Sequence, residues 1–278
     1  MPPANGDLPW NDFDPESYAA YNYRSLRADD GQILAAVRDH FGALARDLPS
    51  GALRGVDVGS GSNLYPALAM LPWCSRISLL ERGKRNVDWL RRELGRYSEN
   101  WDEFWRVLGE DPAYRAVADP RRRLAQIARV VDGNLFSDLP EHSADIGTMF
   151  FVAESVSAHH EEFAAAVDRF AAALRPGAPF AVAFMENSLG YEVGDLRFPA
   201  CRITAEDALA ALAGHAASDL GVIRIETPET GPLRDGYTGI LLALGRKGAE
   251  GQNIDMQSVR GDPPDAPPPR TPGPRPAP

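Results

Sequence analysis

The sequence is poor in cysteine and has no long apolar run. Its 278 residues include two cysteines, Cys74 and Cys201, far apart and outside any C-x-x-C spacing. They provide neither a disulfide framework nor a zinc knuckle. The longest apolar runs, such as 179–185, have the length of a strand, well short of the roughly 18 residues needed to cross a bilayer. The first 20 residues also lack the basic and apolar regions of a secretory signal, so we expect a cytoplasmic protein.

Basic residues are outnumbered by acidic ones. Lysine and arginine total 29 against 39 aspartates and glutamates, which gives a formal net charge of −10. An acidic surface repels phosphate backbones and anionic lipid, so nucleic acid and membranes are poor candidates for partners. A hydrophobic fraction of 44% in a chain of this length provides for one large α/β domain or two small ones. We expect a monomer whose partner is a small molecule.

Composition divides the chain into three parts. Nine of the 24 prolines lie in the last 18 residues, and the region 248–278 has few large apolar side chains to offset the entropy of ordering it. We expect a disordered, proline-rich tail there, a main domain over 51–247 and an N-terminal helical cap over 1–50. In the cap, a helix start is followed closely by three tyrosines, Tyr18, Tyr21 and Tyr23. These tyrosines either pack the cap onto the domain or cover a ligand.

The main domain alternates strand-like and helical patterns. An alternation of this kind predicts an α/β fold with a largely parallel sheet and helices on both faces. The expected strands are 53–58, 76–80, 127–131, 145–152 and 180–184, with a closing pair at 221–226 and 239–244. The expected helices are 64–71, 85–94, 161–174 and 205–213.

The sharpest motif is a strand that enters a glycine turn at Gly59 and Gly61 and continues into a helix. Such a turn lets the backbone approach a nucleotide at the first crevice of a parallel sheet. A pyrophosphate fingerprint would have a third glycine where Leu64 stands, and Asp57 precedes the turn. This pattern disfavours NAD and suits a cationic nucleoside such as S-adenosylmethionine. Glu81, at the end of the next strand, is placed to accept hydrogen bonds from ribose hydroxyls.

Several of these residues together resemble the nicotinamide, phenylethanolamine and thioether methyltransferase family. The resemblance rests on Phe13-Asp14-Pro15-Glu16-Ser17-Tyr18 with Tyr23, on Val56-Asp57-Val58-Gly59-Ser60-Gly61 with Tyr65, and on Glu81 with Asn86. It implies a class I methyltransferase fold, Rossmann-like, with a seven-stranded, mostly parallel sheet and an antiparallel C-terminal strand. It also implies S-adenosylmethionine as cofactor, covered by the two tyrosines. The positions that would contact the cofactor are Tyr18, Tyr23, Asp57, Gly59, Ser60, Gly61, Tyr65, Glu81, Asn86 and Asp132.

Two acids are candidates for work on the substrate. Glu154 matches a position where the amine-methylating members carry an acid near the substrate nitrogen; otherwise it caps the coming helix or pairs with a cation. Glu186 offers a second acid or is a solvated loop residue. Tyr191 matches a substrate-facing tyrosine, and Tyr18 and Phe184 are expected to line the substrate site. Phe184 replaces the acid that holds a carboxamide, which disfavours nicotinamide itself.

Adjacent histidines, His159 and His160, lack the H-E-x-x-H spacing of a metal site, so we expect no bound metal. The predicted function is S-adenosylmethionine-dependent methylation of a nitrogen in a small amine or N-heterocycle. Three alternatives stay open at this point: methylation of a thioether sulfur, a protein that binds the cofactor without turnover, and an NAD-dependent oxidoreductase.

Overall fold

A sheet of seven strands forms the centre of the molecule. The computed structural model describes residues 2–44, 51–226 and 236–249. The strands lie in the order β3-β2-β1-β4-β5-β9-β8. Their bounds are β1 (Leu53–Val58), β2 (Cys74–Glu81), β3 (Ala128–Asp132), β4 (Ile146–Phe150), β5 (Pro179–Glu186), β8 (Gly221–Glu226) and β9 (Gly239–Arg246). The strands from β3 to β5 pair in parallel and β9 is antiparallel to both neighbours, which confirms the sheet that was expected.

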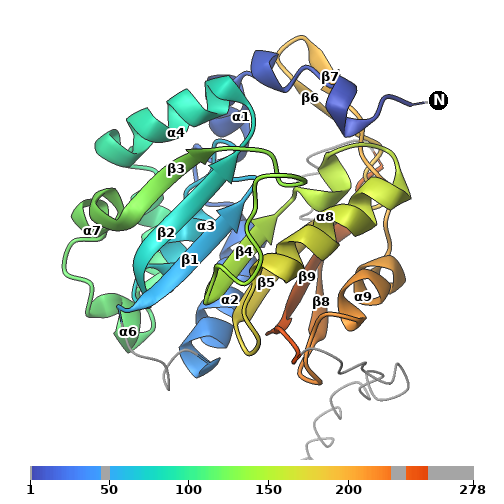
Figure 1. Cartoon of the computed structure of the whole chain (residues 1–278). Helices are drawn as coiled ribbons and strands as arrows, with labels where there is room; N and C mark the ends of the chain where they lie inside the picture. The colour runs from blue at the N-terminus through green and yellow to red at the C-terminus, as the bar shows by residue number, and fades with distance from the viewer. Residues whose placement is uncertain (1, 45–50, 227–235, 250–278) are drawn as a thin grey trace, which may run out of the picture.

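Helices cover both faces of this sheet (Figure 1). On one face lie α8 and α9, and on the other lie α2 and α3. The helices are α1 (Pro15–Asn22), α2 (Ala28–Leu44), α3 (Tyr65–Met70), α4 (Lys84–Arg96), α5 (Trp101–Leu108), α6 (Pro112–Arg115), α7 (Pro120–Ile127), α8 (His160–Ala173) and α9 (Ala205–Ala213), with short 3-10 turns η1 (Asn5–Asp7), η2 (Trp10–Asp12) and η3 (Ala153–Ser155). Within the described ranges, none of the helices is both long enough and apolar enough to cross a bilayer.

Buried aromatic side chains hold α8 against the sheet. Phe163 and Phe170 of α8 contact Phe184 and Phe180 of β5, with ring centroids 5.6 and 6.3 Å apart. Edge-to-face contacts of this kind add to the stabilisation that area burial provides. Phe184, expected to be part of the substrate site, is fully buried in this core.

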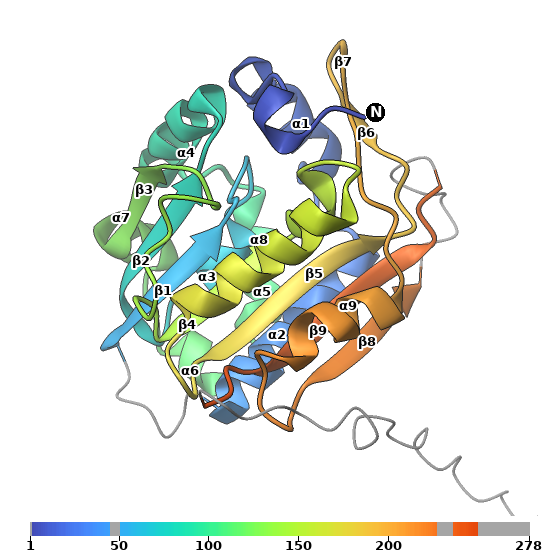
Figure 2. The same cartoon turned by 45° about the vertical axis from the view of Figure 1, so that its right-hand side comes forward.

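The order of the strands creates a crevice at one edge of the sheet. Strand β1 pairs with β2 on one side and with β4 on the other, so the connections leaving β1 and β4 diverge to opposite faces. In α/β folds, ligands bind at such a point, outside the carboxyl ends of the strands. Figures 1 and 2 place α1 and a small hairpin, β6 (Tyr191–Val193) and β7 (Leu196–Phe198), beyond this end of the sheet.

Two regions have more structure than the sequence indicated. The region 101–127, for which no elements were predicted, contains α5, α6 and α7. The segment between β5 and α9 contains the β6–β7 hairpin, whose strands have three residues each. Such short strands do not show the alternation by which strands are recognised.

The first 44 residues divide into two structurally different parts. Residues 5–22 form η1, η2 and α1, and α1 begins at an N-cap, Asp14, whose side chain accepts hydrogen bonds from the backbone of Glu16 and Ser17. Helix α2, by contrast, packs against β5, β8 and β9. The structure thus shows a short N-terminal segment followed by a helix of the main core. The expected tail at 248–278 lies almost wholly outside the described residues.

Candidate functional site

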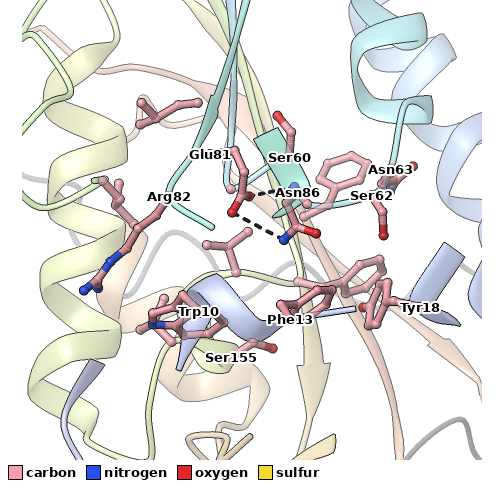
Figure 3. A pocket seen from close by; sticks show the side chains of 18 of the residues that line it. Trp10, Phe13, Tyr18, Ser60, Ser62, Asn63, Glu81, Arg82, Asn86 and Ser155 are labelled. Carbon is pink, nitrogen blue, oxygen red and sulfur yellow. Dashed lines mark hydrogen bonds between the residues drawn. The ribbon is translucent and has the colours of Figure 1, made fainter. Parts of the chain in front are cut away.

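A large pocket lies at the carboxyl ends of β1, β2 and β4. It encloses about 860 Å³ of empty space, a volume that includes the part open to solvent. The glycine turn contributes 59–63, the end of β2 contributes Glu81 and Arg82, and the stretch after β4 contributes 150–152 with Ser155 and Val156. The N-terminal segment closes it with Trp10, Phe13 and Tyr18 (Figure 3). Asn5 and Tyr23 of the same segment also line it.

The glycine turn brings the backbone close to the segment after β4. Gly59 has a φ of +66°, and a Cβ added there would lie 2.6 Å from Val152. Gly61 has a φ of +55°, but its added Cβ would meet nothing closer than 3.8 Å. A left-handed backbone and a close neighbour therefore both require glycine at position 59. Phe151, on the opposite wall, also has a positive φ of 61°, a strain that the surrounding structure must compensate.

Glu81 is fixed at the floor of the pocket. Its carboxylate accepts hydrogen bonds from the backbone N–H groups of Gly61 at 2.9 Å and Gly83 at 2.7 Å. The side-chain amide of Asn86 lies 3.4 Å from the same carboxylate (Figure 3). Burial raises the pKa of Glu81, and the three donors oppose that shift. The acid thus links the glycine turn to the start of α4, as a ribose-binding carboxylate would.

Two polar atoms in the pocket wall have no hydrogen-bond partner among the residues that the structure describes. The side-chain oxygen of Asn86 and the hydroxyl of Ser62 are buried and find no hydrogen bond among the described residues. Buried polar atoms in folded proteins are nearly always paired, with protein, water or ligand. Both residues line the pocket next to Glu81. These features fit a ligand with several hydroxyl or amino groups, such as a nucleoside.

An aromatic layer closes the opposite end. Tyr18 lies against Tyr23 and Tyr191, with ring centroids 6.1 and 6.4 Å apart. Tyr191 in turn stacks on Phe198 of the β6–β7 hairpin at 5.4 Å. The hairpin and the N-terminal segment therefore form one wall, to which Trp10 also adds by stacking on Phe198 at 5.1 Å.

The N-terminal segment is tied down on both sides of the pocket. Arg82, which follows β2, donates to the backbone oxygen of Asn5. The backbone N–H of Asn5 lies 3.0 and 3.2 Å from the two carboxylate oxygens of Glu162 on α8. On α1, Glu16 accepts hydrogen bonds from Trp89 and Arg92 of α4. The segment thus bridges elements from the two halves of the sheet.

Eight of the residues predicted from the sequence line this pocket together: Tyr18, Tyr23, Gly59, Ser60, Gly61, Glu81, Asn86 and Tyr191. Asp57, Tyr65 and Asp132 do not. Asp57 is buried within the sheet, where it accepts a hydrogen bond from Thr148 at 2.8 Å, and burial raises its pKa to about 7. Tyr65 lies beneath the pocket, stacked on Phe104 at 5.5 Å. Asp132 is exposed, while the next two residues, Gly133 and Asn134, are in the wall.

The two predicted substrate acids lie behind the wall. Glu154 is fully buried and accepts a hydrogen bond at 3.0 Å from the backbone N–H of Met185. Glu186 accepts one from Arg224 at 2.8 Å and one from Thr238 at 2.7 Å. Neither side chain is part of the pocket lining.

Sequence reasoning missed several lining residues. Trp10 of η2 and the loop residues Arg82, Asn134 and Phe151 come together from four separate regions of the chain. One signal was available for Phe151 and its neighbours, because residues after β4 must border the crevice. In the part of the chain that the structure describes, no three histidine, cysteine, aspartate or glutamate side chains gather as metal ligands would.

One solved structure supports the fold. The DhpI–SAH complex is 13% identical and superposes with a TM-score of 0.52 over 84% of this chain and 91% of that one. An N1-methyltransferase for 1,6-didemethyltoxoflavin from Burkholderia thailandensis is 18% identical, with a TM-score of 0.48 over 85% of this chain and 91% of the other. At these identities the likeness concerns the fold alone. No curated protein matches the chain.

A comparison with profiles of protein families is more specific than the structural likeness. The profile of the NNMT/PNMT/TEMT family matches residues 6–248, which is well over half of the chain. The match begins in the N-terminal segment and ends just after β9, so it includes every residue that lines the pocket except Asn5. The chain therefore belongs to the NNMT/PNMT/TEMT family of S-adenosylmethionine-dependent methyltransferases.

Proposed function

We propose that this protein transfers a methyl group from S-adenosylmethionine to a nitrogen of a small amine or N-heterocycle. The observation that carries the proposal is the division of the pocket into two unlike ends. A polar end, at Glu81 and Asn86, suits the nucleoside of the cofactor. An aromatic end, at Tyr18 and Tyr191, suits a flat or apolar substrate and excludes bulk water.

The cofactor would be held by residues of the glycine turn and by Glu81. We assign ribose recognition to Glu81 and Asn86, and the covering of the cofactor to Tyr18 and Tyr23. Gly59, Ser60 and Gly61 let the backbone approach it. Asp57 and Tyr65 act from below by fixing the turn, and Gly133 and Asn134 take the place beside the cofactor that was expected of Asp132. When bound, S-adenosylmethionine supplies a methyl group on a positively charged sulfur.

The chain itself contributes position and a water-free site. Holding a nucleophile in line with its target can supply roughly 7–11 kcal/mol of the barrier reduction. The N-terminal segment, which is tied to α4 and α8, covers the pocket and so would keep water out and hold the reactants in place. An alkyl amine is protonated at neutral pH, so a carboxylate that accepts the proton would add about 10²- to 10⁴-fold in rate.

For Glu154 we propose a supporting role in place of direct contact with the substrate nitrogen. Its carboxylate holds the backbone of Met185, and its neighbour Ser155 lines the pocket. Glu186 is compensated by Arg224. A direct role for Glu186 would require this ion pair to break.

A methyl-transfer assay tests the proposal. Purified protein is incubated with S-adenosylmethionine and panels of amines, N-heterocycles and thioethers, and products are identified by mass spectrometry. We expect methylated nitrogen products whose formation is lost in Glu81→Ala. Products formed only from thioethers would overturn the nitrogen specificity. Cofactor binding without turnover on any panel would favour a binding protein instead.

A further inference from the structure

A small recess adjoins the pocket behind its tyrosine layer. Its outline encloses about 270 Å³, including the part open to solvent, and the enclosed part has room only for a small group. Tyr18, Tyr23 and Phe151 line both the recess and the large pocket, so the two spaces meet at these side chains. The rest of its lining is Asn22, Asp30, Met185 and Ile240. Glu81 and Asn86, which we assign to the ribose, do not line the recess, so it adjoins the end of the pocket that we assign to the substrate.

Asp30 is the charged side chain of this recess. It lies in the first turn of α2 and is 5% exposed. Its neighbour Asp29 is already engaged with Arg27 at 3.2 Å. Within the described ranges, no cation lies at salt-bridge distance from Asp30 itself. An ionised carboxylate buried in this way is costly unless a positive group pairs with it.

The surroundings of Asp30 set its protonation near neutral pH. Burial, and then the nearby charge of Asp29, raise its pKa to about 7. The hydroxyl of Tyr65 and the charge of Arg27 oppose this shift. The carboxyl group can therefore both lose and accept a proton in the range where most enzymes work.

The other walls suit a cation. Aromatic rings attract positive charge over their faces, by about 0.5–2 kcal/mol according to how far the cation is desolvated. Tyr18, Tyr23 and Phe151 provide three such rings around the mouth of the recess. An acid at the base and aromatic rings at the entrance recognise an ammonium group better than a neutral ring.

We propose that this recess binds the positively charged nitrogen of an amine substrate, with the Asp30 carboxylate as its counter-ion and proton acceptor. The inference rests on the proposed N-methylation and narrows its substrate class to aliphatic amines. In the proton step, one N–H bond of the ammonium breaks and its electron pair stays on nitrogen. The proton forms an O–H bond with a carboxylate oxygen of Asp30. The nitrogen then has the lone pair that methylation requires.

If Asp30 had a purely structural role, its replacement by asparagine would affect amine binding no more than the same replacement of its neighbour Asp29. Acids in the first turn of a helix are stabilised by the helix dipole, and this applies equally to Asp29. Asp29 is 1% exposed and accepts a hydrogen bond from the backbone N–H of Asp30, but it does not line the recess. Asp29→Asn is therefore the matched control for Asp30→Asn.

The experiment measures amine binding by calorimetry with the full chain saturated with S-adenosylhomocysteine. The probes are methylamine, cyclohexylamine and benzylamine, each beside the alcohol of the same skeleton. We expect at least one amine to bind more tightly than its alcohol at pH 8. Asp30→Asn should weaken amine binding about 10- to 100-fold, as loss of a charged hydrogen bond does, and leave alcohol binding unchanged. Asp30→Glu should restore part of the preference, and Asp29→Asn should retain it.

The pH dependence gives a second readout. Only the ionised carboxylate pairs with an ammonium group, so amine affinity should rise with pH through about 7 and be flat in Asp30→Asn. No preference for any amine, or a preference that survives Asp30→Asn, overturns the proposal. An equal loss in both variants also overturns it. If S-adenosylhomocysteine itself fails to bind, the proposed function fails first, and that result is distinguishable from the three outcomes above.

Discussion

Gly59 and Gly61 share a backbone conformation but differ in what surrounds them. Both have positive φ, yet an added Cβ would lie 2.6 Å from Val152 at Gly59 and 3.8 Å from its nearest neighbour at Gly61. The left-handed conformation alone costs an alanine about 1–2 kcal/mol. We expect Gly61→Ala to show that cost in urea denaturation, and Gly59→Ala to lose more stability and at least about tenfold in affinity for S-adenosylhomocysteine. Equal effects in the two variants would contradict the close approach at Gly59.

Glu154 offers a test of support without direct contact. Its carboxylate accepts a hydrogen bond from the backbone N–H of Met185, which faces the recess. Glu154→Ala removes this acceptor and should lower the free energy of unfolding by about 1–3 kcal/mol. Glu154→Gln keeps an oxygen at the same place and should recover most of the stability and of kcat/KM. If Glu154→Gln folds as well as the wild type but loses turnover as Glu154→Ala does, the charge acts on the substrate directly.

For single residues, the spacing along the chain predicts part of the site. The glycine turn and Glu81 follow the ends of β1 and β2, so their place at the crevice follows from the fold class. The direction of a single side chain is harder to predict. Asp57 points into the sheet towards Thr148, and Phe184 packs beneath α8 against Phe163. Their partners lie far away in the sequence, and nothing local reveals them.

The N-terminal segment is the element whose attachment controls access to the pocket. Glu162 on α8 accepts the backbone N–H of Asn5, which lines the pocket. Glu162→Gln weakens this charged contact, so we expect the segment to open more often and S-adenosylhomocysteine to dissociate about 3- to 10-fold faster. Stopped-flow displacement measures this rate. Glu161→Gln, the exposed neighbour on the same helix, is the control and should leave it unchanged.

The elements of the main strand–helix alternation are predictable here, whereas the 17-residue α2 and the short elements outside that alternation are not. The sequence pattern predicts all seven strands of the main sheet, and α8 ends where expected, before Pro176 and Gly177. Helices α5 to α7 are four to eight residues long and lie in a charged, aromatic region that hides their periodicity. The β6–β7 hairpin depends on stacking with Trp10 and Tyr18, which tertiary structure alone provides.

For the whole molecule, two buried acids give stability an unusual dependence on pH. Burial raises the pKa of Asp30 and that of Asp57 from 3.8 to about 7. At pH values between these two pKa values, both acids are protonated in the folded state and ionised in the unfolded chain. Stability from these groups is therefore present at low pH and falls as pH rises from about 4 to 7.

We compare how the free energy of unfolding depends on pH in the wild type and in a double variant. Asp30→Asn with Asp57→Asn removes both titrations, and the asparagine at 57 can still accept the hydrogen bond from Thr148. Between pH 5 and 8 the wild type should lose at least about 2 kcal/mol of unfolding free energy relative to this double variant. Burial lowers the pKa of His40, so this residue makes stability rise with pH. It does so equally in both proteins and therefore drops out of their difference. If the free energy of unfolding depended on pH in the same way in both proteins, the two acids would have ordinary pKa values, which would contradict the prediction.

The central claim is that the pocket under the N-terminal segment holds S-adenosylmethionine with Glu81 at its ribose. Calorimetric titration with S-adenosylhomocysteine, on the wild type and on Glu81→Ala, tests it most directly. The account predicts one site per chain in the wild type and an affinity at least about tenfold weaker in Glu81→Ala, from the loss of charged hydrogen bonds. Absence of binding to the wild type, or equal binding by both proteins, would contradict it.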